Sequence, residues 1–199
     1  MPLAGSALVL SAAMIIAGGI TDPVAIPYVN SLGNAIATWM VSNTIVENIP
    51  PTMIAAGSGV SGFGNIDFTG GAGAGDSFGA AMAASIPAVD TPGIAKWKAI
   101  GNALVDHMKS KGFINPTTFV ANPLGGAVTG TGLIAFTSMT FSPTIGSVVF
   151  PIFDTAGYAS MASIGSTILT HIAANALVNS LGFTSPSGGG PLVGVSTIA

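Results

Sequence analysis

The sequence repeats itself three times, and this repetition limits the folds that the chain can adopt. Residues 26–69 align without a gap to residues 94–137, which lie 68 positions later, and 13 of the 44 aligned residues are identical. A third copy follows at a spacing of 64, and 11 of its 42 aligned residues match the second copy. A fixed period of this kind is typical of chains built from similar modules. We therefore predict one array of three modules, at residues 1–70, 71–138 and 139–199.

Each copy carries the pattern of a long amphipathic helix. In the second copy, apolar residues recur at spacings of three and four, at Trp97, Ile100, Leu104 and Met108. The other copies have apolar residues at the same positions: Val29, Leu32, Ile36, Met40, Met161, Ile164, Ile168 and Ile172. We interpret these residues as the buried faces of three helices.

A shorter, alanine-rich helix is expected ahead of each long one. The expected ranges are 4–17, 76–86 and 144–153. The pair Asp76-Ser77 has the residue types of an N-cap, and Pro87 would end the second of these helices. The glycine-rich tract 70–75 is interpreted as a flexible connector between the first two copies.

The second half of each copy alternates with the two-residue period of a strand. Glycines on the same parity as the apolar residues would let another backbone come close. The residues expected to make strand contacts are Val60, Gly62, Gly64, Ile66, Val128, Gly130, Gly132, Ile134, Gly194 and Ile198. Short single strands are unstable, so we expect them to pair around a pseudo-threefold axis or to extend a neighbouring subunit's sheet.

Together these patterns predict a helix-rich α+β fold. Each of the three tandem modules would contain an alanine-rich helix, a longer amphipathic helix and a short glycine-rich strand. An apolar pair ends the helical half of each module: Ile45-Val46, Phe113-Ile114 and Leu177-Val178.

Charged residues are scarce and unevenly placed. Only 6% of the residues are charged, against roughly a quarter in a typical soluble domain. All of the basic residues are lysines of the second copy: Lys96, Lys98, Lys109 and Lys111. A net charge of -3 without a basic face argues against nucleic acid as a partner. Because the long helices of copies one and three lack such charges, we expect other modules or other chains to cover them.

Two uncharged stretches raise the alternative of a membrane-embedded or membrane-inserting protein. Residues 3–20 and the segment between Lys111 and Asp154 are both long enough for a spanning helix. The first lacks the basic region of a secretory signal. The second contains several prolines and glycines, which a lipid-exposed helix would not carry. Contact with a membrane remains an alternative that we do not favour.

No pattern of catalytic or metal-binding residues emerges. His107 and His171 are equivalent by the repeat, but no Cys, Asp or Glu set repeats with them to complete a zinc site. We interpret both as locally hydrogen-bonded helix residues. The Gly-x-Gly strings lack the third glycine of a dinucleotide site, and no Gly-x-Ser-x-Gly elbow is expected between a strand and a helix. The acidic residues are scattered singly. We expect no enzymatic activity, cofactor or metal.

The module resembles short modules of tailed-bacteriophage virion proteins. The resemblance rests on the helix segment 100–108, with the form Ile-Gly-Asn-Ala-Leu-x-x-His-Met, and on the strand Val-Thr-Gly-Thr-Gly at 128–132. It covers all three copies, from about residue 26 to the end. It implies a structural protein of the virion, in contact with other virion proteins, and no catalytic residues. Tail or baseplate is favoured, and a capsid decoration or cement protein is the alternative.

Overall fold

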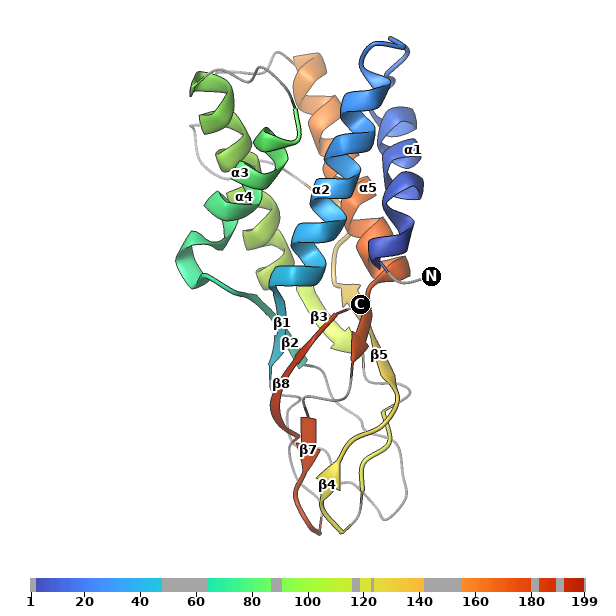
Figure 1. Ribbon diagram of the computed structural model, residues 1–199, viewed down its shortest axis with the longest axis vertical. Helices are drawn as coiled ribbons and strands as arrows, with labels where there is room; N and C mark the ends of the chain where they lie inside the picture. Colours follow the sequence, from blue (N-terminus) through green and yellow to red (C-terminus); the bar gives the residue numbers. More distant parts are fainter. Residues whose placement is uncertain are drawn as a thin grey trace.

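Helices and strands occupy opposite ends of an elongated molecule (Figure 1). The computed structural model describes residues 3–47, 64–86, 91–115, 119–122, 124–141, 155–179, 183–188 and 192–198. The fold is a mixed α+β one in which the helices pack side by side at one end and the strands taper away from them. The expected helix at 144–153 and the strand positions Val60 and Gly62 lie outside the described residues.

Three long α-helices, two shorter α-helices and two short 3-10 helices are described at the helical end. The described helices are η1 (Leu3–Ser6), α1 (Ala7–Ala17), α2 (Ile26–Asn43), η2 (Gly71–Gly73), α3 (Ala74–Ala84), α4 (Thr91–Lys111) and α5 (Thr155–Asn175). The predicted apolar stripes are confirmed, because the described stripe residues of α2, α4 and α5 lie in or against the hydrophobic core. Among the described residues, no helix combines the length and apolar character that crossing a membrane requires.

All of the described strands pair antiparallel. They are β1 (Thr44–Glu47), β2 (Gly64–Phe68), β3 (Gly112–Asn115), β4 (Gly126–Ala127), β5 (Thr131–Phe136), β6 (Leu177–Asn179), β7 (Phe183–Ser185) and β8 (Val193–Thr197). The order in the sheet is β4-β7-β8-β1-β2-β3-β5-β6. A further bridge joins Val178 of β6 to Ile198, the residue that follows β8. The six strands β1, β2, β3, β5, β6 and β8 therefore close into a ring beneath the helices.

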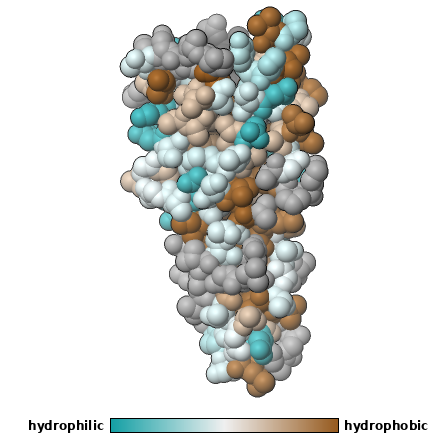
Figure 2. Space-filling model, viewed as in Figure 1, coloured by the Kyte–Doolittle hydropathy of each residue, from teal (hydrophilic) through white to brown (hydrophobic). Residues whose placement is uncertain are grey.

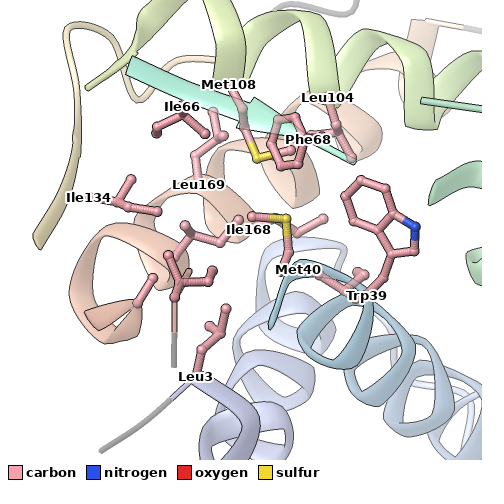
Figure 3. Close-up of a cluster of buried hydrophobic side chains, with 14 of the residues drawn as sticks. Leu3, Trp39, Met40, Ile66, Phe68, Leu104, Met108, Ile134, Ile168 and Leu169 are labelled. Atoms are coloured by element: carbon pink, nitrogen blue, oxygen red, sulfur yellow. The ribbon is translucent and has the colours of Figure 1, made fainter. Parts of the chain in front are cut away.

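One β-branched residue from each of these six strands, or from the position beside it, fills the ring. These residues are Val46, Ile66, Ile114, Ile134, Val178 and Ile198, and none is more than 3% exposed. Figure 3 shows Ile66 and Ile134 close to Met40, Met108 and Ile168, which come from the long helices. The interior of the ring and the core between the helices thus form one continuous cluster. Burial of each such side chain contributes about 1.5–3 kcal/mol.

Five of the described strands were not predicted from the sequence: β4 and β7, which are two and three residues long, and the three strands that follow the long helices. β1, β3 and β6 follow the ends of the long helices α2, α4 and α5 and contain the apolar pairs that we assigned to the end of the helical half. They are at most four residues long, so their own periodicity is too short to recognise. Pairing with β2, β5 and β8 stabilises them as strands.

Two predictions around the start of α3 were wrong. The helix begins at Ala74 after Gly73, so Asp76-Ser77 lies inside its first turn and is not the N-cap. Asp76 instead accepts a hydrogen bond of 2.7 Å from the Asn102 side chain. The tract 70–75 is not a flexible connector, because it forms η2 and the first turn of α3, and Gly75 packs directly on Asn102.

Candidate functional site

Glycines allow close contact between helices α1 and α2 and between helices α3 and α4. A Cβ atom at Gly33 of α2 would overlap Ser11 of α1, and one at Gly101 of α4 would overlap the backbone of Gly75 and Gly79 in α3. Close approach of two helix backbones requires small residues at the crossing. The pairs α1/α2 and α3/α4 are therefore tightly packed. We call the boundary between one pair and the next helix a seam.

Two seams contain a groove on the outer surface. The groove between α2 and α3 has a volume of about 530 Å³ and is lined by Ser31, Asn34, Ala35, Thr38, Trp39, Ser42, Asn43, Ala81 and Ser85. The groove between α5 and α1 has a volume of about 450 Å³ and is lined by Val9, Ala13, Ser163, Ser166, Thr167, Thr170, His171, Ala174 and Asn175. Neither lining contains a charged side chain. Each α5 residue in the second lining lies 132 positions after an α2 residue in the first lining. This distance is the sum of the two repeat spacings, 68 and 64, so the two helices contribute equivalent residues to their grooves.

One polar contact crosses each seam at the positions that the repeat aligns. Trp39 Nε1 donates to Ser77 Oγ of α3 at 3.1 Å. His171 Nε2 lies 2.8 Å from Ser6 Oγ of η1. The third aligned residue, His107, has its Nε2 at 3.0 Å from the Ser138 carbonyl oxygen. The prediction of local bonding was wrong for His107, whose partner is 31 residues away, and incomplete for His171, whose ring faces Asn175 four residues away and also reaches Ser6.

The proton position on His171 follows from its neighbours. Ser6 Oγ donates to the Leu3 carbonyl at 2.8 Å, so it is an acceptor toward the ring, and His171 Nε2–H is the donor. The other nitrogen, Nδ1, lies 3.4 Å from Asn175 Nδ2. The same Nδ2 donates to the His171 carbonyl at 2.9 Å, so the nitrogen of the amide, and not its oxygen, lies beside the ring. From these contacts we assign His171 as the neutral imidazole with its proton on Nε2.

Ser6, His171 and Asn175 have the residue types of a nucleophilic triad but the wrong polarity. A serine nucleophile needs an unprotonated Nε2 that accepts the hydroxyl proton, and a third residue that accepts from Nδ1. Here Nε2 donates and Nδ1 faces an amide donor. Ser6 is also completely buried. The Gly-x-Ser-x-Gly string at 75–79 lies inside α3, and its Ser77 is bonded by Trp39.

The charged side of the molecule lies on α4. Lys109 Nζ forms an ion pair of 2.7 Å with Asp67 Oδ1 of β2, and both side chains are more than a third exposed. The hydrogen bond from Lys109 lowers the pKa of Asp67, against the opposing effect of partial burial. The pKa of His171 is also lowered, but here the cause is burial, which disfavours the charged form. Among the described residues, no three His, Asp or Glu side chains gather as a metal site would require.

The glycines that lie inside the described strands are paired within the chain, whereas Val128 and Gly130 precede β5 and lie outside it. Gly64 pairs with Ile114, Gly132 with Val178, and Gly194 with Phe183. The side chains of Ile66, Val128, Ile134 and Ile198 are buried. Gly130 has a φ of 99°, a conformation that favours glycine. The sequence analysis predicted neither the grooves nor the role of Ser6. The only signal for them in the sequence is the repeat position shared by Trp39, His107 and His171.

No family model matches the chain, and no similar protein was found among curated proteins or solved structures.

Proposed function

We propose that the chain is a non-enzymatic structural subunit of a bacteriophage particle, built from three fused modules around a pseudo-threefold axis. It would pack against other virion proteins through the uncharged faces of its helices. Tail or baseplate is the favoured location, and a capsid decoration or cement role is the alternative. The phage context follows from the resemblance of the modules, and the threefold arrangement is supported by the pairing of the strands.

The strand ring supports the threefold arrangement through its registers. Three strand pairs join residues of the same module: Val46 with Ile66, Ile114 with Ile134, and Val178 with Ile198. From the first pair to the second both residues shift by 68 positions, and from the second to the third both shift by 64, as the repeat does. Three pairs between modules are spaced in the same way: Gly64 with Ile114, Gly132 with Val178, and Ser196 with Val46. The last of these pairs links the third module back to the first. Such a cycle is what rotation about a threefold axis would produce.

The helical end supports the same arrangement. Gly33, Gly101 and Gly165 occupy one position of the repeat, and each faces the segment that precedes its helix. Trp39, His107 and His171 share another position: Trp39 bonds to Ser77 near the start of the second module, His171 bonds to Ser6 near the start of the first, and His107 bonds to Ser138, the last residue of the second. Modules arranged in a cycle would fit a site where three copies of a neighbouring protein meet.

The surface chemistry supports a role in assembly. Helix α1 contains no charged residue and exposes Leu8 at 71%, Val9 at 53% and Ile16 at 81%. In Figure 2, apolar residues gather along the edge of the helical end where α1 lies in Figure 1. Exposed apolar surface that lacks charge is characteristic of protein interfaces. The single observation that carries the proposal is this exposed apolar face of α1, which has no charged residue.

Quantitative mass spectrometry of purified particles tests the proposal. The expected result is that the chain co-purifies with the particles in a fixed ratio, with one copy for each trimer of its neighbour. Partition between detergent and aqueous phases provides the control, because a virion subunit stays aqueous or sediments with particles. Absence from the particles, or recovery in the detergent phase, would contradict the proposal and favour a membrane protein.

A further inference from the structure

The seam between α5 and α1 is held by a buried histidine that has no charged neighbour among the described residues of the elements packed against it. His171 is 6% exposed, and its Nε2 donates to Ser6, which is fully buried. Helix α1 and η1 pack against α5 at this seam. The equivalent contact at the α2/α3 seam comes from Trp39, which does not titrate in the range of a histidine. The two seams therefore differ in one titratable group.

We propose that the Ser6–His171–Asn175 cluster is an acid-sensitive latch, which holds the N-terminal segment 3–17 against α5 at neutral pH and releases it when His171 is protonated. The latch is a property of the fold and does not depend on the phage context. It gives the molecule two states of the α5/α1 seam, and pH selects between them.

Hydrogen bonding explains why the protonated state is disfavoured in the closed seam. Protonation would add a hydrogen to Nδ1, which already faces the Asn175 amide donor at 3.4 Å. Two donors would then face each other in a buried site. Asn175 could present its oxygen only by giving up the 2.9 Å hydrogen bond to the His171 carbonyl. The closed seam therefore accommodates neutral histidine and not its cation.

The part of the surroundings that the structure describes offers no compensating charge. Helix α5 packs against α1, η1 and β5, and none of these three elements contains a titratable side chain. On α5 itself the other titratable residue is Tyr158, at the opposite end of the helix. The last turn of α5 favours a cation slightly, but burial outweighs this effect and lowers the pKa of His171. A buried charge without a partner destabilises the packing around it.

Opening the seam would expose apolar surface. Leu10 and Met14 of α1 are at most 1% exposed in the closed state. A released α1 would present them together with Leu8 and Ile16, which are exposed already. Acid would thus convert a closed helical end into one with a larger apolar face, while the α3/α4 pair stays closed. His107 takes no part in this seam, because its Nε2 lies 3.0 Å from the Ser138 carbonyl.

Amide hydrogen exchange between neutral pH and about pH 5, corrected for intrinsic rates, tests the latch in the full chain. We expect protection in segment 3–17 to fall at least tenfold on acidification and protection in α3 to change little. His171→Gln keeps an N–H donor toward Ser6 but does not titrate, so its protection should be independent of pH in this range. His107→Gln is the matched control and should behave like the wild type.

An NMR titration of the His171 ring in the wild-type chain supplies a measurement that needs no variant. The loss of protection should follow the protonation of His171, at a pH below the ordinary value of 6.5. Protection that persists below the measured protonation midpoint would overturn the latch. The same acid response in a folded His171→Gln variant would also overturn it.

Discussion

Ser6 and His171 are 165 residues apart in the sequence, yet Ser6 Oγ and His171 Nε2 lie 2.8 Å apart. This contact joins the first helical segment to the last helix. The strand ring is joined in the same sense, because β8 pairs with β1. The start and the end of the described chain are thus neighbours in both layers.

Gly101→Ala should destabilise the protein. The new Cβ would overlap the carbonyl oxygen of Gly75 and the backbone of Gly79, which cannot move aside as a flexible side chain can. Overpacking of this kind costs about 1–3 kcal/mol, measurable by urea denaturation. Gly73→Ala is the matched control, because nothing lies within 4 Å of a Cβ at that position. Equal stability of the two variants would show that the α3/α4 crossing is not as tight as described.

Removing a side chain from the strand ring should cost a similar amount at equivalent positions. Ile66→Ala and Ile134→Ala each leave a cavity in a fully packed layer, so we expect each to lose about 2–5 kcal/mol. Denaturant unfolding of both variants measures the losses. Costs that differ by more than about 2 kcal/mol would argue against equivalent environments for the two residues.

Gly130→Val should be more harmful than Lys98→Ala. Gly130 has a φ of 99°, and a β-branched residue in this conformation is strained by about 1–3 kcal/mol. Lys98 is half-buried and its backbone lies against Gly79 of α3; truncating its side chain leaves that backbone in place and should change stability by about 0.5 kcal/mol or less. Thermal unfolding compares the variants. A melting temperature for Gly130→Val at or above that of Lys98→Ala would be inconsistent with the left-handed backbone at this glycine.

The Asp67–Lys109 ion pair should make a small, pH-dependent contribution. Lys109 lowers the pKa of Asp67, so the stabilisation is complete above the unfolded value of 3.8 and is lost as the pH falls through the folded value. Because both side chains are partly exposed, Asp67→Asn should cost only about 0.2–1 kcal/mol at neutral pH. Stability measured at low and high salt provides the check, since added salt should shrink the difference between variant and wild type.

The sequence predicted the long helices and the second strand of each copy, because these elements keep one period over many residues. Ile36, Leu104 and Ile168 are buried as their spacing indicated. It did not predict β1, β3 and β6, which are too short to show a period and depend on pairing. The glycine-rich composition of residues 70–75 led to the wrong prediction of a flexible connector. A glycine that permits a helix contact, as Gly75 does, cannot be distinguished by composition from one in a connector.

The candidate site was the least predictable part. The column formed by Trp39, His107 and His171 was visible in the alignment, but its partners were not, since Ser6 and Ser77 are brought to the seams only by the packing of helices. The grooves arise in the same way, from residues of two helices that belong to different copies of the repeat.

Reconstruction of the intact particle by electron cryomicroscopy, without imposed local symmetry, tests the proposed function most directly. We predict one copy of the chain on a threefold axis of its neighbours, with the uncharged faces of α1, α2 and α5 covered and the charged face of α4 exposed to solvent. A copy that lies away from any threefold axis with its α1 face open to solvent, or a particle that lacks the chain, would contradict the proposal.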